Sequence, residues 1–132
     1  MLKAISIFKR HVSLTLLMLA MGCGGGSEGG GLRNSKTVEG AADHLVEAFD
    51  GSSVQLKKHA RSASESMRKG KYRAALISIQ EIKLSGEVAH FEEGAAVRDS
   101  LVNLEEELIY GMENGDPNAA KTYELLKRVN RN

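Results

Sequence analysis

Histidine and carboxylate side chains are the first candidates for chemistry in this chain. Glu87 and His90 have the Glu-x-x-His spacing that places two ligands on one helix face, as in the di-iron sites of helical bundles. Such a site also needs a second Glu-x-x-His, but no glutamate stands three residues before His44 or His59. We therefore predict no metal site and no cofactor. A metal or small-ligand carrier that uses Glu87 and His90 is kept as a hypothesis that metal analysis would test.

The known motifs of catalytic sites that we looked for do not indicate an enzymatic reaction either. The sequence contains no His-Glu-x-x-His and no second cysteine for a zinc cluster. No spacing indicates a nucleophile beside a general base. We expect that the protein is not an enzyme, and we predict no catalytic residue.

Cys23 is the only cysteine, which excludes an internal disulfide and makes its position informative. It follows an apolar run at residues 12–20, and a basic segment containing Lys9 and Arg10 precedes that run. A basic start and a short apolar run are typical of an export signal. The run is too short for a membrane-spanning helix, which needs about 20 residues. We predict that residues 1–22 are a signal peptide.

The residues Leu19-Ala20-Met21-Gly22-Cys23 resemble the lipobox of bacterial lipoproteins. This resemblance implies cleavage between Gly22 and Cys23, acylation of Cys23 with groups such as palmitate, and a lipid anchor in the cell envelope. Gly24 after the cysteine, in place of aspartate, implies by the same resemblance an outer-membrane anchor that faces the periplasm. Ala20 stands where that family usually has leucine, and Ala20 with Gly22 also suits an ordinary signal peptidase. A soluble periplasmic or secreted protein is therefore one alternative, and a cytoplasmic protein is another.

A glycine-rich segment separates Cys23 from the rest of the chain. Six of the 14 glycines fall within residues 24–31. Such a composition predicts a flexible tether, and residues 24–36 would have a root-mean-square reach of about 20 Å. We predict three parts: a signal peptide at 1–22, a lipidated cysteine with its tether at 23–36, and a helical domain at 37–132.

The composition favours helices over strands. Aromatic residues make up 5% of the chain, tryptophan is absent and Pro117 is the only proline. Removing Lys3, Lys9 and Arg10 with the signal peptide leaves 15 of the 18 basic residues against 17 acidic ones. This slightly negative balance argues against a nucleic-acid partner. We predict a single small all-α domain.

The recurrence of apolar residues predicts five antiparallel helices, at residues 38–49, 52–69, 71–84, 87–113 and from 117 onward. Ser52 and Gln55 have the spacing of a capping box, and Asp116 is expected to cap the last helix with Pro117 at its first position. The inward residues of the last two helices are expected to be Phe91, Val97, Leu101, Leu104, Leu108 and Met112, then Ala119, Ala120, Tyr123 and Leu126.

Two parts of the helical domain are related by a constant offset of 45 residues. In each part an amphipathic helix runs into a glycine turn and a second helix that opens with two alanines. The small residues are expected to let the two helices approach closely at the turn. The matched residues are Leu56 with Leu101, Met67 with Met112, Gly70 with Gly115, and Ala74-Ala75 with Ala119-Ala120.

The stretch Gly70-Lys71-Tyr72-Arg73-Ala74-Ala75 resembles the start of the second helix of a tetratricopeptide repeat, Gly-Asp-Tyr-x-x-Ala. The resemblance covers about residues 54–84 and 99–130, although the signature of the family's first helix is absent and the period is 45 residues instead of 34. It implies helical hairpins that bind peptides or proteins, with the first helix of the domain as a cap. We expect a small tetratricopeptide-like array of about five helices.

Basic residues gather between residues 57 and 73, where Glu65 is the only acidic residue, whereas residues 87–113 are rich in glutamate. One interpretation is that these are solvated faces that partly complement each other across neighbouring helices. The other is a basic surface that contacts anionic lipid headgroups or an acidic partner. This possible basic surface consists of Lys57, Lys58, Arg61, Arg68, Lys69, Lys71 and Arg73.

Two functions are expected from these patterns in addition to the metal carrier. The first is a lipid-anchored envelope protein whose helical domain binds an envelope protein or peptide. The second is a structural envelope lipoprotein without a dedicated groove.

Overall fold

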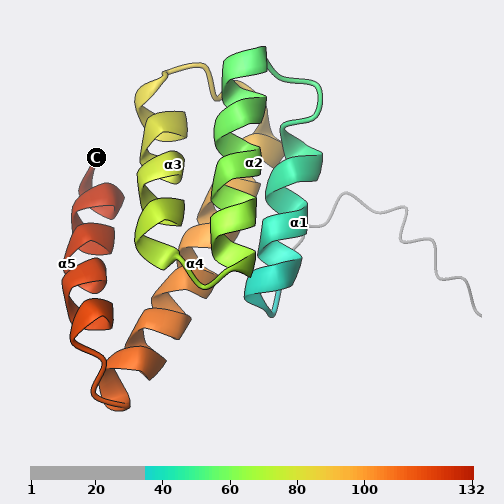
Figure 1. Cartoon of the computed structure of the whole chain (residues 1–132). Helices are drawn as coiled ribbons and strands as arrows, with labels where there is room; N and C mark the ends of the chain where they lie inside the picture. The colour runs from blue at the N-terminus through green and yellow to red at the C-terminus, as the bar shows by residue number, and fades with distance from the viewer. Residues whose placement is uncertain (1–34) are drawn as a thin grey trace, which may run out of the picture. The chain divides into compact units, whose positions relative to one another are not determined.

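The computed structural model describes residues 35–132 (Figure 1). The predicted signal peptide, the Gly22–Cys23 cleavage site, the lipidation site and most of the predicted tether lie outside the described residues. The described part is all-helical, with α1 at Val38–Ala48, α2 at Val54–Arg68, α3 at Tyr72–Leu84, α4 at Phe91–Glu113 and α5 at Pro117–Arg131. This confirms the predicted all-α array of five helices. No helix within residues 35–132 has both the length and the apolar character required to cross a membrane.

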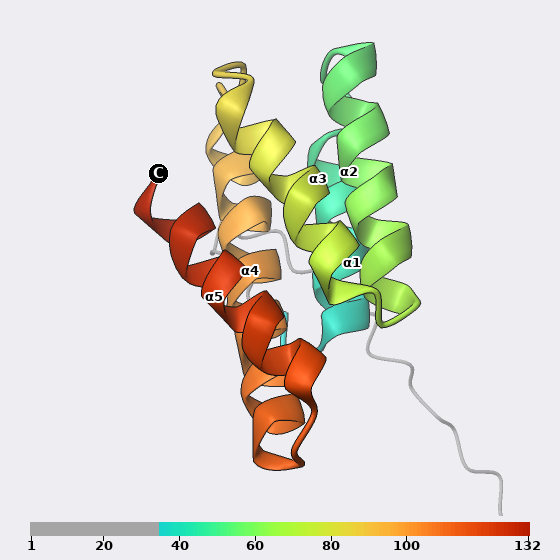
Figure 2. The same ribbon diagram turned by 60° about the vertical axis from the view of Figure 1, so that its left-hand side comes forward.

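Consecutive helices run antiparallel, so α2 with α3 and α4 with α5 form two hairpins (Figure 1). Helix α1 packs against both α2 and α4, and α3 packs against α4 and α5. Figure 2 shows α5 lying across the side of the bundle made by α3 and α4. The first helix therefore joins the two hairpins to each other, which is more than the end cap that we expected from the repeat.

Side-chain caps mark the starts of α1, α2 and α5. The hydroxyl of Thr37 accepts a hydrogen bond from the Gly40 N–H (3.1 Å) at the start of α1. Asp116 accepts one from the Asn118 N–H (2.8 Å) with Pro117 at the first position, which confirms the predicted start of α5. These bonds satisfy N–H groups that have no carbonyl partner in the first turn.

The predicted capping box from Ser52 to Gln55 is wrong. Ser53 caps α2 by accepting a hydrogen bond from the Leu56 N–H (3.3 Å). The Ser52 hydroxyl donates instead to the Glu93 carboxylate on α4. The cap of α2 is therefore one residue later than predicted, at Ser53, and the helix begins at Val54.

The predicted start of α4 at Glu87 is also wrong, because the helix begins at Phe91. Gly86 has φ +69°, and the Glu93 carboxylate accepts hydrogen bonds from the N–H groups of Ala89 (3.0 Å) and His90 (3.2 Å). The N–H groups of Ala89 and His90 therefore bond to the Glu93 side chain and not to backbone carbonyls of a preceding helical turn. Residues 87–90 form a loop before α4.

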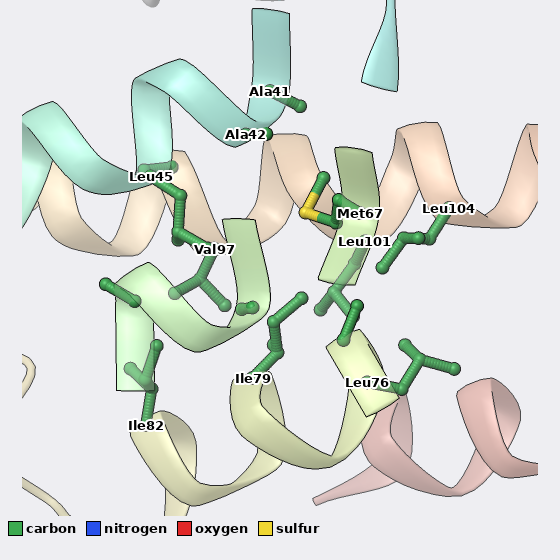
Figure 3. Packing of buried hydrophobic residues seen from close by; sticks show 14 of the residues in the cluster. Ala41, Ala42, Leu45, Met67, Leu76, Ile79, Ile82, Val97, Leu101 and Leu104 are labelled. Carbon is green, nitrogen blue, oxygen red and sulfur yellow. The ribbon is translucent and has the colours of Figure 1, made fainter. Parts of the chain in front are cut away.

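The core is built from the inward faces of all five helices. Figure 3 shows Met67, Ile79 and Leu101 projecting into the same interior from α2, α3 and α4. Most of the predicted inward residues of α4 are buried, but Phe91 is exposed because it lies on the same side of α4 as the exposed Val102 and Ile109, away from the core. Met112 is half-buried and packs against the core.

In α5 the predicted face is partly wrong. Ala119 and Leu126 are buried as expected, Tyr123 is half-buried and Ala120 is exposed. The buried face of α5 is Ala119, Thr122, Leu126 and Val129, which recur at intervals of three and four residues. Ala120 lies about 100° around the helix from Ala119 and faces away from this line.

Both turns of the predicted repeat depend on glycine. Gly70 and Gly115 have φ +68° and +81°, a left-handed conformation that side-chain-bearing residues rarely adopt. The alanines behave differently, since Ala75 is buried in α3 whereas Ala119, one step earlier in the repeat, is buried in α5. The hairpins therefore share the turn, but their second helices bury faces that differ by one residue position.

Candidate functional site

An open groove lies where the two hairpins meet, with a volume of about 420 Å³. It is lined by the start of α3, the C-terminal half of α4 and the start of α5, and we call it the α3–α5 groove. Its lining includes Lys71, Tyr72, Arg73, Ile77, Glu107, Leu108, Gly111, Asp116 and Ala119. The two glycine turns place these segments side by side, because each turn sends its second helix back along the first (Figure 2).

The lining of the groove is mostly apolar and includes small residues such as Gly111 and Ala119. A Cβ atom built on Gly111 would lie 2.8 Å from the Ala119 Cβ, which shows that α4 and α5 approach too closely at this point for a side chain at residue 111. This confirms the expected close approach of small residues at the second turn. Ile77 of α3 is 47% exposed and forms part of the lining, so the groove presents apolar surface to solvent.

Charged residues of both signs line the same groove. Lys71 and Arg73 come from the start of α3, and Glu107 and Asp116 come from α4 and the turn before α5. The Tyr72 hydroxyl donates to the Glu107 carboxylate at 3.4 Å. Burial raises the pKa of Tyr72, and the negative charge of Glu107 raises it further.

The structure separates the seven residues of the possible basic surface into three groups. Arg68 pairs with Asp43 of α1, and Lys69 pairs with Glu65 one helical turn earlier. Lys71 and Arg73 line the α3–α5 groove, whereas Lys57, Lys58 and Arg61 lie together along α2.

Within the described part of the chain, the expected complementarity between the possible basic surface and the glutamates of α4 does not take the form of direct ion pairs. In residues 35–132, no salt bridge joins the possible basic surface to a carboxylate of α4. The lysine beside Glu65 lowers the pKa of this exposed carboxylate. The pairs that do form are exposed, and such pairs contribute little to stability.

Glu87 and His90 do not form the helix-face pair that their spacing suggests, because both precede the first residue of α4. Glu87 accepts a hydrogen bond from the Ser53 hydroxyl (2.9 Å), and His90 occupies the capping position of α4. His59 lies 3.0 Å from the Gln55 side-chain nitrogen on α2. Within the part of the chain that the structure describes, no group of three histidine, cysteine or carboxylate side chains is placed to hold a metal ion.

A buried polar cluster that no sequence pattern predicted lies between α1 and α4. The Asp99 carboxylate accepts a hydrogen bond from the Ser35 N–H (2.9 Å) and lies 3.1 Å from Nδ1 of His44. The Asn103 side-chain amide donates to the Ser35 carbonyl (3.1 Å). His44, Asp99 and Asn103 are buried, and their mutual bonds satisfy them. This cluster fastens the entry of the helical domain to α4.

A second missed cluster joins the two loops at the other end of α1. Glu93 is buried and accepts hydrogen bonds from Ser52 and from the backbone of Ala89 and His90. Burial raises the pKa of Glu93, but these hydrogen bonds together outweigh burial and leave its pKa below the ordinary value. The only sequence feature that could have indicated this cluster was the serine pair after Gly51, which we interpreted as a local helix cap.

Comparison of the chain with protein-family models, with curated proteins and with solved structures finds no match.

Proposed function

We propose that this is a lipid-anchored protein of the cell envelope whose helical domain binds a protein or peptide in the α3–α5 groove. The observation that supports binding most strongly is the groove itself, which is open, partly apolar and built by both hairpins. Ile77 exposes nearly half of its surface there. An exposed aliphatic side chain within a concave surface favours contact with an apolar group of a partner.

The charges of the groove suggest which partner would fit. Lys71 and Arg73 form a basic side, while Glu107 and Asp116 supply acidic groups from the facing helices. A short segment with an apolar residue between an acidic and a basic residue would complement both sides. Charge of this kind contributes to the orientation and selectivity of a partner more than to its affinity.

The proposed anchor is supported by sequence. Cys23 is the only cysteine, and it stands between a signal-like segment and a glycine-rich segment. An outer membrane with the helical domain facing the periplasm is the proposed location. The helical domain then serves as a tethered module, and its tetratricopeptide-like hairpins are the part that contacts a partner.

The anchor is tested by the intact mass of protein purified from membranes. Residues 23–132 with added acyl groups are expected, and a Cys23→Ser variant should lose these groups and leave the membrane fraction. An unlipidated chain of the same residues in the soluble fraction would instead identify the soluble periplasmic or secreted alternative.

The groove is tested separately with a photocrosslinking amino acid placed at residue 77 in intact cells. The matched control is residue 54, because Val54 is 82% exposed and lies at the start of α2, outside the groove. A partner that crosslinks from residue 77, does not crosslink from residue 54, and is lost in a Lys71→Glu/Arg73→Glu variant supports the module. Equal or absent crosslinking from both positions would favour the purely structural lipoprotein.

A further inference from the structure

Helix α4 has a face that no other described helix covers. It packs against α1 on one side and against α3 and α5 on another. Along the remaining face Phe91, Val102 and Ile109 are 66%, 44% and 37% exposed. Their intervals of 11 and 7 residues keep them within about 20° of one line along the helix. Three large apolar side chains therefore form a stripe, which we call the α4 stripe.

The charges beside the α4 stripe are arranged around Val102. Arg98 precedes Val102 by four residues, and Glu105 and Glu106 follow it by three and four. Among the described residues no acidic group pairs with Arg98, and no basic group pairs with Glu106. At a rise of 1.5 Å per residue, the opposite charges lie about 5–6 Å from Val102 in opposite directions along the helix.

This arrangement complements itself when two copies of α4 run antiparallel about a two-fold axis at Val102. The two Val102 side chains then meet, and Arg98 of each copy lies at the height of Glu105 and Glu106 of the other. A two-fold interface requires this kind of surface, because the same patch contributes both halves of each contact. A parallel pair would instead bring Arg98 against Arg98 and glutamate against glutamate.

A shallow hollow beside the stripe fits the same register. It has a volume of about 370 Å³ and is lined in part by Gly94, Val97, Arg98 and Leu101. In the antiparallel pair, Ile109 of the second copy lies at the height of residue 95, next to Gly94. A Cβ built on Gly94 meets no atom within 4 Å, so there is room for that side chain.

We propose that the protein self-associates through the α4 stripe, with α4 antiparallel to α4 of a second copy. The α3–α5 groove uses Glu107, Leu108 and Gly111, which lie on a different side of α4 from Val102 and Ile109. The pair therefore leaves both grooves open. This proposal does not depend on what the groove binds.

Disulfide formation in the full chain tests the geometry, with Cys23→Ser present so that the introduced cysteine is the only thiol. Val102→Cys should form a dimer under mild oxidation, because the two residues meet at the axis. Ile109→Cys should not, because its two copies are about 20 Å apart along the helices. Efficient crosslinking of both variants, or of neither with a monomeric mass in light scattering, would overturn the antiparallel pair.

Charge exchange gives a second test that does not introduce cysteine. Arg98→Glu places only acidic groups at the contact, and Glu105→Arg/Glu106→Arg places only basic ones, so each variant alone should self-associate at least about tenfold more weakly. Their mixture should recover the dimer, since every contact again joins opposite charges. Both variants should keep the helical circular-dichroism spectrum, and a mixture no stronger than either variant alone contradicts the proposal.

Discussion

Replacing Gly111 with alanine tests the close approach of α4 and α5. The added Cβ would lie 2.8 Å from the Ala119 Cβ, and the Asp116 Cβ would be 4.0 Å away. A methyl group at that distance cannot be accommodated by rotating a flexible side chain, because its neighbour is also a Cβ fixed to a helix backbone. The two helices must separate at the turn, and the lining of the α3–α5 groove moves with them.

Two opposing effects set the size of the change. Alanine is a better helix former than glycine, by about 0.5–1 kcal/mol in a helix interior. Overpacking a close contact costs about 1–3 kcal/mol. The clash prevails, and Gly111→Ala should lower the free energy of unfolding by about 0.5–2 kcal/mol. For a domain of about 100 residues, each kcal/mol lowers the melting temperature by about 4–8 °C.

Urea titration followed by circular dichroism measures this change, with Gly94→Ala as the matched control on the same helix and with Arg98→Glu in the parent and in every variant, so that pairing through the α4 stripe does not contribute. A Cβ at Gly94 meets nothing within 4 Å, so that variant should be as stable as the parent or slightly more stable. Gly111→Ala combined with Ala119→Gly removes one of the two clashing atoms, and its cost should be less than the sum of the single changes. If Gly111→Ala is as stable as Gly94→Ala, the inferred contact between the helices is refuted.

Three further predictions concern the buried contacts and the turns. The pKa of Glu93 lies below the ordinary glutamate value, so its contribution to stability is fully present above that ordinary value and is lost as the pH falls through the lowered pKa of the folded protein. Glu93→Gln should therefore flatten the dependence of unfolding free energy on pH in the acidic range, and an unchanged slope would contradict this. Asp99→Ala should cost about 3 kcal/mol in urea titration because it leaves buried polar partners unpaired, and a cost below about 1 kcal/mol would show that they find other partners. Gly70→Ala and Gly115→Ala should each cost about 1–2 kcal/mol because of their positive φ, while Gly51→Ala, outside that region, should be nearly neutral in the same titration.

The pattern of apolar residues was sufficient to predict five helices and both glycine turns, because helical periodicity and the conformational freedom of glycine are local properties. The predictions were wrong where a residue distant in the sequence determines the start or the cap of a helix. Glu93 moves the start of α4 to Phe91 and withdraws Ser52 from the cap of α2. No spacing within either segment contains that information.

Predictions about the candidate sites were also correct for local features and incomplete for contacts between residues distant in the sequence. The sequence predicted a hairpin pair with small residues at its turns, and the groove lies beside those turns. It did not predict that the basic residues between 57 and 73 would divide among ion pairs, the groove and α2. It also did not place Asp99 beside His44, because 55 residues separate them and a charged residue on a helix is usually exposed.

The attachment of Ser35 to Asp99 and Asn103 determines where a mechanical load would enter the helical domain. A pull on the chain before Ser35 is resisted first by hydrogen bonds to α4, and only afterwards by the first turn of α1. Without the hydrogen bonds of Ser35 to Asp99 and Asn103, tension would unwind α1 one turn at a time, since the end of a helix opens at little cost in free energy. With these bonds, the load is shared between α1 and α4, and the bundle resists as a unit until the bonds break.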